Sequence, residues 1–275
     1  MKIKVNSNFS LIETVTCGQI FRFFLQEDGS YDIILKDRII NVSQKGNYLT
    51  VFSNNNKDLL TNVTNYFDLN NDYDYIDNFL IKSDKKIEDA VIKSRGMNLI
   101  NQDPFEVCIS YIVSANNSVL SISKSINEIA RRWGEKVLFD DKTYYLFPEY
   151  CALKDVSIQE YKECKVGFRD KYIYNFVKRV NDNQSYLQSI YSLSTDEALL
   201  SLMQSPGIGP KVASCILLFA YQKYDVFPVD TWVKKIFKNI YGIENESNIR
   251  AFAKKTYGKY SGVAIQYLFH TSRNK

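Results

Sequence analysis

A lysine and an aspartate in one short segment predict covalent chemistry on a sugar. Residues 202–232 read LMQSPGIGPKVASCILLFAYQKYDVFPVDTW, so that Lys211 opens one predicted helix and Asp230, nineteen positions later, opens another. A lysine that loses its hydration becomes a nucleophilic amine near neutral pH, and a carboxylate stabilises positive charge that develops as a leaving group departs. Lys211 is therefore the candidate nucleophile, and Asp230 is the candidate stabiliser of the transition state.

The Pro-Gly-Ile-Gly-Pro turn before Lys211 predicts a binding site for a phosphate. Gly207 and Gly209 can adopt backbone angles that are closed to other residues, and they let another backbone come close. Pro206 restrains the entry to the turn, and Pro210 suits the first turn of the next helix. The first N–H groups of a helix lack internal partners and lie at the positive end of its dipole, which suits a phosphate oxygen. By itself, the turn is equally typical of an ordinary connection between helices.

The surroundings of Lys211 favour a functional role over a solvated one. Three apolar residues share its helix: Val212, Ile216 and Phe219. Cys215 lies one turn after the lysine, on the same face. A lysine at a helix start is usually solvated, and an aspartate at such a position is a good N-cap. We expect Asp230 to cap its helix even if it also serves the reaction.

Composition confines any nucleic-acid surface to local clusters. The 275 residues are enough for a sizeable core and two domains. The net charge of +4, from 35 basic and 31 acidic residues, is too small to indicate nucleic-acid binding by itself. Basic clusters occur at residues 131–133, 177–179, 233–238 and 251–255. Each is typical of the solvated face of a helix, and together with the hairpin they predict a surface that follows phosphates.

The five cysteines argue against a metal site and for a reducing compartment. They stand at positions 17, 108, 151, 164 and 215, with no Cys-x-x-Cys spacing. No signal peptide is apparent, and no apolar run approaches the roughly twenty residues that span a bilayer. We expect an intracellular protein without membrane association, located in the cytoplasm or nucleoid of a prokaryote or the nucleus of a eukaryote.

The pattern of elements changes near residue 55. Four segments rich in aromatic and branched residues predict an antiparallel sheet, with strands at residues 19–25, 31–36, 38–44 and 48–53. Apolar spacings then predict helices at residues 58–67, 85–94, 104–113, 118–134, 169–182, 195–204, 211–222, 230–242 and from Ser261 onward. We expect the helices after about residue 100 to form one bundle, with the sheet packed at its side.

Several segments together resemble one enzyme family. They are CGQIFRF (17–23), GMNLINQDPFEVCISYIVSANNS (96–118), YYLFP (144–148), VGFRDKY (166–172), the hairpin, FPVDTW (227–232) and YSGVAIQYLFH (260–270). In this order they resemble the helix-hairpin-helix DNA glycosylases with a Gly/Pro-rich loop and trailing aspartate, and most of all the 8-oxoguanine DNA glycosylase/AP lyases. The resemblance spans nearly the entire chain. It implies an α+β fold, with a sheet and flanking helices in residues 1–95 and a helical catalytic domain in residues 96–275, whose last helices can pack back on the N-terminal part.

The resemblance implies excision of 8-oxoguanine from duplex DNA in base excision repair. Lys211 would attack the deoxyribose C1′, displace the base and form an imine with the opened sugar. Asp230 would stabilise the cationic sugar, and β-elimination would then nick the strand 3′ to the site. The target nucleotide must first leave the base stack, because a duplex hides the glycosidic bond.

The resemblance also implies roles in binding the base and the DNA. The Gly18 carbonyl would accept the N7 hydrogen that 8-oxoguanine has and guanine lacks, while Phe269 and Cys215 would lie on opposite faces of the base. We also expect Phe219, Pro228 and Gln266 in the base pocket. On the DNA, Asn116 would enter the space left by the base, and Arg169, otherwise an ordinary surface arginine, would contact the orphaned cytosine. The remaining expected DNA contacts are Asn117, Gly207, Gly209 and Trp232.

Two positions depart from the family pattern. The family commonly has a glutamine four residues before the stacking phenylalanine, where this chain has Ile265, with Gln266 next to it. A shift of one residue turns a helical side chain by about 100 degrees, so recognition of the pairing edge of the base is in question. Animal members have an arginine where this chain has Ser121, which predicts a weaker preference for the opposite base. The only histidine, His270, is expected on a helix surface or in packing rather than in catalysis.

The expected partner is damaged double-stranded DNA, bound by a monomer. No cofactor is expected, although a monovalent cation at the hairpin carbonyls fits the pattern. Related enzymes of the endonuclease III type carry four closely spaced cysteines for an iron–sulfur cluster after this region, and this chain lacks them. The alternatives are a monofunctional alkyl-purine glycosylase of the 3-methyladenine type, a pyrimidine-lesion glycosylase/lyase, and a non-catalytic DNA-binding module. Lys211 argues against the first, the missing cysteine cluster against the second, and the Lys211–Asp230 pair against the third.

Overall fold

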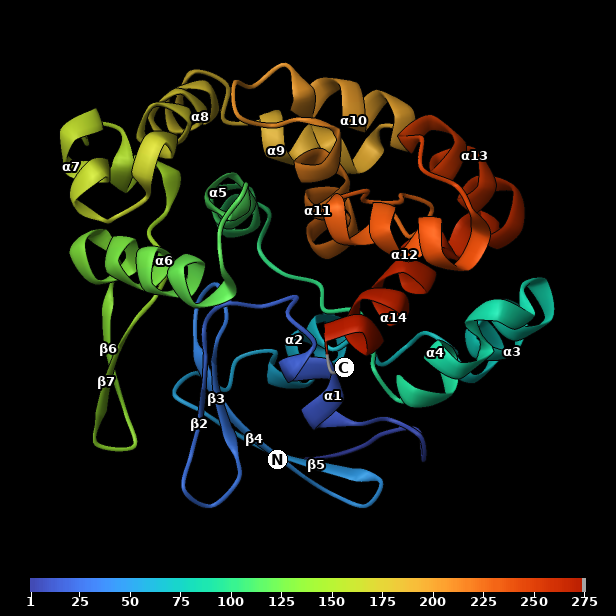
Figure 1. Ribbon diagram of the computed structural model, residues 1–275. Coiled ribbons are helices and arrows are strands. Elements are labelled where there is room, and N and C mark those ends of the chain that lie inside the picture. The colour runs from blue at the N-terminus through green and yellow to red at the C-terminus, as the bar shows by residue number, and fades with distance from the viewer. Residues whose placement is uncertain (274–275) are drawn as a thin grey trace.

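A small antiparallel sheet lies beneath an arc of helices (Figure 1). The structure, a computed structural model, describes residues 1–273. Within these residues, no helix is both long and apolar enough to cross a membrane. The expected α+β class is confirmed, because the sheet comes first along the chain and a mainly helical remainder follows it.

The predicted N-terminal sheet is confirmed, with one strand more than expected. Its strands are β1 (Lys2–Lys4), β2 (Phe23–Leu25), β3 (Tyr31–Ile34), β4 (Ile39–Lys45) and β5 (Tyr48–Ser53), in the order β1-β5-β4-β3-β2. Gly29 and Gly46 make the turns between consecutive strands with φ angles of 83° and 55°, which glycine adopts without strain. Helices α1 (Leu11–Thr16) and α2 (Leu59–Tyr66) share a buried core with the sheet.

Every helix predicted from apolar spacing is present, with α2 packed against the sheet and the others in the helical remainder. It comprises α3 (Tyr73–Ser83), α4 (Glu88–Lys93), α5 (Pro104–Ser114), α6 (Val119–Trp133), α7 (Ile158–Glu163), α8 (Asp170–Asp182), α9 (Tyr186–Ser189), α10 (Thr195–Met203), α11 (Pro210–Tyr221), α12 (Thr231–Tyr241), α13 (Glu246–Tyr257) and α14 (Ser261–Arg273). Helices α1, α3, α7, α9 and α13 were not predicted from the sequence. The start of α7 carries a capping box between Ser157 and Glu160, a signal that was present in the sequence.

Helices α5 and α11 form the centre of the helical part. Every residue from Val212 to Tyr221 is buried in α11, and α5 is buried from Phe105 to Val113 with the exception of Glu106. A helix that is apolar on nearly all sides must be surrounded by protein, and these two helices pack against each other. Figure 1 shows α5 at the middle of the arc, with α11 beside it.

Two large hydrophobic cores organise the chain, beside a small cluster between the two sheets. One lies between the sheet, α1 and α2, and the other extends through the helices from α3 to α14. Three buried or half-buried aspartates also accept hydrogen bonds from tyrosines of the C-terminal helical part. The pairs are Asp68–Tyr224 at 2.6 Å, Asp77–Tyr267 at 2.8 Å and Asp84–Tyr257 at 2.8 Å. These hydrogen bonds hold α3 against the C-terminal part, and α4 packs on α14. The division expected after residue 95 stays a prediction about domain organisation.

A second, two-stranded sheet interrupts the helices. Strands β6 (Lys136–Phe139) and β7 (Lys142–Tyr145) pair as an antiparallel hairpin, which the sequence analysis missed. Asp140 and Asp141 form its turn with φ angles of 49° and 58°. Aspartate tolerates this left-handed region better than most residues, so the Asp-Asp pair between two branched and aromatic segments was the signal.

Candidate active site

The predicted hairpin is formed by α10, the Pro-Gly-Ile-Gly-Pro loop and α11. Arg179 of α8 braces the loop by donating hydrogen bonds to Ser205 Oγ at 3.0 Å and Gln204 Oε1 at 2.9 Å. Gly207 has a φ of 87°, and a Cβ atom there would lie 2.5 Å from Tyr172 Cγ. The expectation that Gly207 needs both the freedom and the small size of glycine is confirmed.

Gly209 differs from Gly207, and the expectation of an unusual backbone there is wrong. Its φ of −88° is ordinary extended backbone, and a Cβ atom would meet nothing within 4 Å. No side chain caps α11, and the first hydrogen bond into the helix runs from the Ala213 N–H to the Gly209 carbonyl. The N–H groups of Lys211 and Val212 precede that bond. Glycine at position 209 therefore leaves open the approach to N–H groups that suit a phosphate.

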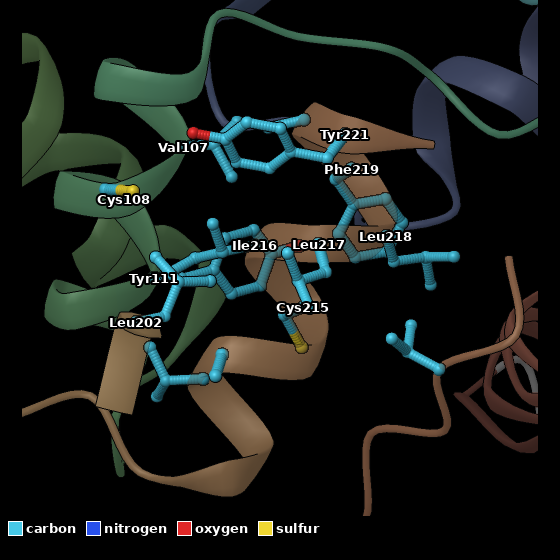
Figure 2. Close-up of a cluster of buried hydrophobic side chains, with 14 of the residues drawn as sticks. Val107, Cys108, Tyr111, Leu202, Cys215, Ile216, Leu217, Leu218, Phe219 and Tyr221 are labelled. Atoms are coloured by element: carbon cyan, nitrogen blue, oxygen red, sulfur yellow. The ribbon is translucent and has the colours of Figure 1, made fainter. Parts of the chain in front are cut away.

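The Lys211 side chain lies over the floor made by α5 and α11. Its Nζ is 5.5 Å from the centre of the Tyr111 ring, and that ring stacks on Phe219 with 5.6 Å between centroids and 15° between planes. Cys215 lies between Lys211 and Phe219 on α11. Figure 2 shows Tyr111 of α5 packed against α11, with the Cys215 sulfur nearby. The predicted common face of Lys211 and Cys215 is confirmed, and Phe219 belongs to the same floor through its stacking on Tyr111.

The charges of Lys211 and Asp230 both act on Cys215. Burial raises the pKa of the Cys215 thiol, the neighbouring Lys211 ammonium opposes that rise, and Asp230 adds to it. Burial also raises the pKa of Tyr111, with further contributions from Cys215 and Cys17. The predicted amine and carboxylate therefore lie around one thiol, and the chain preceding Gly18 comes close to the same floor.

Asp230 begins α12 as predicted. Its Oδ1 accepts a hydrogen bond from the Val233 N–H at 2.8 Å, so the expected N-cap is confirmed. The segment before it is buried, Pro228 included, and Arg250 donates a hydrogen bond to the Phe227 carbonyl at 2.7 Å. Trp232, in the first turn of α12, is 52% exposed. The fold thus fixes the backbone that carries Asp230 while leaving an aromatic ring on the surface beside it.

The Gly18 turn meets α14 on the sheet side of the site. Gly18 has a φ of 91°, and Gln266 of α14 places its Nε2 3.4 Å from the Cys17 carbonyl. Phe269 lies on the same helix and is half-buried. The Gln266 amide is thus directed at the backbone next to Gly18. The expected places of Gly18, Gln266 and Phe269 in a base pocket stay predictions.

The asparagine pair lies at the end of α5, where Arg169 holds the backbone. Arg169 donates hydrogen bonds to the carbonyls of Ala115, Asn116 and Val166, and it is only 6% exposed, so the expected surface arginine is a buried one. Asn116 is exposed, with a φ of 51°, and its side chain makes no hydrogen bond to the residues that the structure describes. Asn117 Nδ2 donates to the Val113 carbonyl at 3.2 Å. Arg169 thus fixes the turn that presents Asn116 to solvent.

Two aromatic residues of this region were missed from the sequence. Tyr111 forms the floor under Lys211, and its only signal was an aromatic residue near the end of a mostly apolar helix. Phe168 is 62% exposed, and the Arg169 guanidinium lies 4.4 Å from the centre of its ring. An aromatic residue in VGFRDKY, next to an arginine and outside any apolar repeat, was the available signal for an exposed ring.

Known proteins share this architecture. A family model described as the 8-oxoguanine DNA glycosylase N-terminal domain matches residues 2–108. A probable N-glycosylase/DNA lyase of Methanothermobacter thermautotrophicus is 32% identical over 239 residues, which cover 79% of this chain and 76% of the relative. The solved structure of MBOgg1 in complex with a low-affinity DNA ligand is 35% identical, with a TM-score of 0.95 and coverage of 99% of this chain and 95% of that one.

A further solved structure that is similar to this chain is a complex with DNA that holds the damaged base. It is the Clostridium acetobutylicum 8-oxoguanine glycosylase/lyase in complex with double-stranded DNA that has cytosine opposite 8-oxoguanine. It is 35% identical to this chain, with a TM-score of 0.93, and the match covers 100% of this chain and 98% of that one. Together with the hairpin, Lys211 and Asp230, these similarities show that the chain belongs to the 8-oxoguanine DNA glycosylase/lyase family of the helix-hairpin-helix DNA glycosylases.

Proposed function

We propose that this protein excises 8-oxoguanine from duplex DNA and then cleaves the strand at the abasic site. The observation that carries the proposal is the position of Lys211 at the uncapped start of α11, over the Tyr111 ring and beside Cys215. A phosphate at the free N–H groups of this helix would bring the adjoining sugar close to the amine. Asp230, whose charge acts on the same thiol, would lie near that sugar.

The chemistry follows from an amine attacking a sugar carbon. The neutral Lys211 amine forms a bond to C1′ while the bond from C1′ to the base breaks, and the base leaves with the bonding electrons. The nitrogen then gives a proton to the ring oxygen as the bond from C1′ to that oxygen breaks, which leaves a protonated imine and a free 4′ hydroxyl. Loss of a proton from C2′ expels the 3′ phosphate by β-elimination. The Asp230 carboxylate stabilises the positive charge on the sugar as the base departs.

The Gly18 turn, Cys215 and Phe269 would receive the extruded base. No hydrogen bond from the described residues reaches the Gly18 carbonyl, so this acceptor is available to a ligand. A carbonyl satisfies the N7 hydrogen of 8-oxoguanine but faces a lone pair in guanine, and such a mismatch costs roughly 1–3 kcal/mol. Phe219 and Pro228 complete the proposed pocket, and Gln266 acts on it through the Cys17 carbonyl next to Gly18.

The proposed DNA contacts come from the end of α5, the hairpin loop and the start of α12. The exposed Asn116 fills the gap in the duplex, Asn117 and Arg169 hold its turn near the opposite strand, and the loop of Gly207 and Gly209 receives the phosphate. The exposed Trp232 lies beside Asp230 on the approach to the site. The proposed partner is damaged duplex DNA bound by a monomer, and the proposed chemistry requires no cofactor, with a monovalent cation at the hairpin as an optional aid to phosphate binding.

Borohydride trapping tests this proposal directly. The protein is incubated with duplexes that contain 8-oxoguanine opposite cytosine, a 3-methyladenine-type base, thymine glycol or no damage. A covalent adduct on the 8-oxoguanine duplex alone, lost in Lys211→Gln, is the expected result. Base release without trapping would indicate the water-using alkyl-purine reaction, and trapping on thymine glycol alone would indicate a pyrimidine-lesion enzyme. DNA binding with neither release nor trapping would leave a non-catalytic binding module.

A further inference from the structure

The backbone on both sides of Gly18 is held by glutamine side chains. Gln266 donates from its Nε2 to the Cys17 carbonyl at 3.4 Å, and Gln102 donates from its Nε2 to the Gln19 carbonyl at 3.0 Å. The Gly18 carbonyl between them accepts no hydrogen bond from any described residue. The turn therefore has two neighbouring acceptors that are engaged and a central one that is open, in a backbone conformation with a φ of 91° at Gly18.

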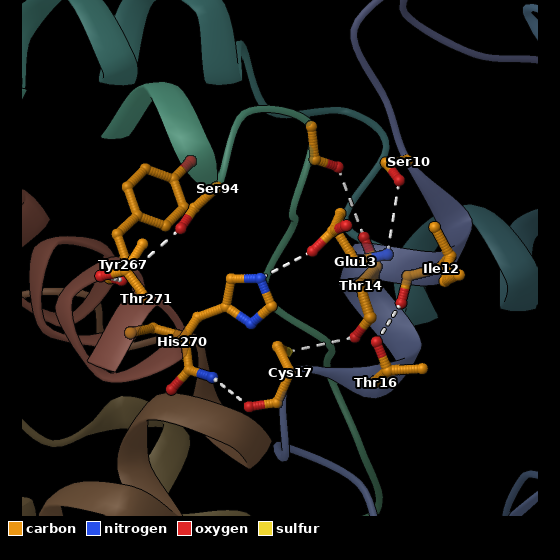
Figure 3. Close-up of polar contacts among 12 residues, drawn as sticks. Ser10, Ile12, Glu13, Thr14, Thr16, Cys17, Ser94, Tyr267, His270 and Thr271 are labelled. Carbon is orange, nitrogen blue, oxygen red and sulfur yellow. Dashed lines mark hydrogen bonds and ion pairs between the residues drawn. The ribbon is translucent and has the colours of Figure 1, made fainter. Parts of the chain in front are cut away.

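Helix α14 holds this turn at a second point. His270 lies one helical turn after Gln266, is buried, and places its Nε2 2.6 Å from Glu13 Oε2 (Figure 3). A carboxylate only accepts hydrogen bonds, so Nε2 is the donor. Glu13 belongs to α1, which ends directly before Cys17. One face of α14 thus binds both α1 and the turn that α1 leads into, and the same helix carries Phe269.

The opposite side of the turn is tied to α11. The Gln19 side chain accepts from the Ile100 N–H at 2.8 Å and donates to the Asn98 carbonyl at 2.8 Å. Farther along this segment, the Gln102 N–H donates to the Phe219 carbonyl at 2.8 Å. A continuous set of hydrogen bonds therefore connects α14, the Gly18 turn and the end of α11 that carries Phe219.

We infer that Gln266, Gln102 and the His270–Glu13 pair are positioning residues that direct the Gly18 carbonyl at N7 of the extruded base. They set the preference for 8-oxoguanine over guanine without touching the base themselves. A hydrogen bond weakens steeply when its length or angle departs from the optimum, so a discriminating backbone acceptor must be held still. This inference rests on the proposed function, and it assigns to Gln266 a role in lesion selection rather than in reading the pairing edge.

The test compares base excision with strand cleavage at a site that has already lost its base. Abasic-site cleavage uses the same Lys211 but needs no base pocket, so it also reports that each variant is folded. Gln266→Met removes the donor and keeps a similar shape, and His270→Leu removes the link to Glu13, whereas His270→Gln retains an N–H donor. Thr271→Val is the matched control, because among the described residues the Thr271 hydroxyl bonds only to carbonyls of its own helix, at 3.0 Å and 3.2 Å.

The rate of single-turnover excision of 8-oxoguanine opposite cytosine should fall roughly tenfold in Gln266→Met and in His270→Leu, because one hydrogen bond to the base is misaligned. The rate of abasic-site cleavage should stay within about twofold of the wild-type rate. His270→Gln should recover part of the loss, and Thr271→Val should leave both activities unchanged. In the Lys211→Gln background, Gln266→Met should weaken binding of the 8-oxoguanine duplex but not of the undamaged duplex.

Three results would overturn the inference. One is unchanged excision in both Gln266→Met and His270→Leu, and another is an equal fall in excision and abasic-site cleavage, which would indicate a general structural role. The third is an equal loss of affinity for damaged and undamaged duplexes. If the wild-type chain cleaves neither the 8-oxoguanine duplex nor the duplex with an abasic site, the proposed function itself is wrong, and so is the inference that rests on it.

Discussion

The Lys211 ammonium lies 5.5 Å from the centre of the Tyr111 ring, so the proposed nucleophile of α11 rests against a ring supplied by α5. The face of an aromatic ring attracts a cation, which holds the side chain over the floor of the site. Tyr111 in turn stacks on Phe219, two helical turns beyond Lys211. The packing of two buried helices thus decides where the amine points.

Replacement of Lys211 by glutamine should abolish base excision and strand cleavage while DNA binding persists. An amide cannot form the bond to C1′, and loss of a nucleophile lowers the rate on the order of 10⁴-fold or more. Single-turnover excision, borohydride trapping and fluorescence anisotropy with an 8-oxoguanine duplex measure the three properties. Lys93→Gln, on the exposed face of α4, is the control. Normal turnover in Lys211→Gln would remove this residue from the role.

The two roles of Asp230 can be separated by two substitutions. Asparagine caps helices as well as aspartate does. Its Oδ1 can still accept the hydrogen bond that the Val233 N–H donates to Asp230 Oδ1 at 2.8 Å in the wild-type protein. Asp230→Asn should slow excision by about 10²–10³-fold through the lost charge, with almost no change in the free energy of unfolding. Asp230→Ala should lose a further ~1 kcal/mol of stability. Equal destabilisation by both substitutions, measured by urea unfolding, would contradict this separation.

The two hairpin glycines should respond differently to alanine. Gly207→Ala meets both a positive φ and the Tyr172 ring, and should reduce the free energy of unfolding by about 1–3 kcal/mol. Gly209→Ala meets no protein atom, so stability should stay within about 0.5 kcal/mol while affinity for duplex DNA falls. Unfolding and anisotropy measurements on both variants check the contrast. Unaltered DNA affinity in Gly209→Ala would place the phosphate elsewhere.

The buried Asp77 should make the protein less stable as the pH rises from about 4 to about 6. Burial raises the pKa of its carboxyl from 3.8 to about 6, although the Tyr267 hydroxyl and Arg95 oppose this rise. The folded state therefore holds a proton that the unfolded state releases at lower pH, and this contribution disappears above the folded pKa. Asp77→Asn should be more stable than wild type at pH 8 by about 1–3 kcal/mol, and the gain should vanish near pH 4.

Asp74 supplies the control of opposite sign for this pH experiment. Hydrogen bonds from the amides of Asn8 and Asn6 lower the pKa of its carboxyl. Its contribution to stability is present above the unfolded pKa and is lost as the pH falls through the folded one. Asp74→Asn should therefore reduce stability at pH 8. Urea unfolding from pH 8 down to about pH 3 distinguishes the two aspartates, because the Asp77 effect changes between about pH 4 and pH 6 and the Asp74 effect is lost only below about pH 4. Parallel pH profiles for both variants would contradict the assignment.

The opposite base should matter less here than in animal members of the family. Ser121 is exposed in the first turn of α6, and its N–H bonds to Ser118 Oγ at 3.2 Å. Arg169, the other expected reader of the opposite strand, already donates to three backbone carbonyls. A bidentate contact between an arginine and a base contributes about 1–3 kcal/mol of discrimination. Because no such contact is expected here, the rates of excision of 8-oxoguanine paired with C, T, G and A should differ by less than about tenfold. A sharp preference for cytosine would contradict this.

Features that depend on neighbouring residues were predicted well. Local backbone preferences account for the helix starts at Pro210 and Asp230 and for the turns at Gly29 and Gly46. Helical spacing accounts for the common face of Lys211 and Cys215. His270 was expected to pack rather than to catalyse, and it is buried against Glu13. These predictions needed no knowledge of what lies across the fold.

Features that depend on distant residues were missed or misjudged. Arg169 was expected on the surface, but the open carbonyls at the end of α5 bind its guanidinium more than fifty residues away along the chain. Gly209 was expected to need an unusual backbone, whereas the position is merely open. The hairpin of β6 and β7 was overlooked because its two strands are short and lie among helices.

By itself, the sequence determined the family of the fold, the hairpin with its helix starts, and the identity of the amine and the carboxylate. Local conformational preference and the order of motifs suffice for these, because each involves residues that are close along the chain. Only the tertiary structure decided that Gln266 holds the Cys17 carbonyl and that Gln102 holds the Gln19 carbonyl. The Gly18 carbonyl between them accepts no hydrogen bond from the described residues. Such contacts join residues 83 and 249 positions apart, and nothing in local spacing specifies them.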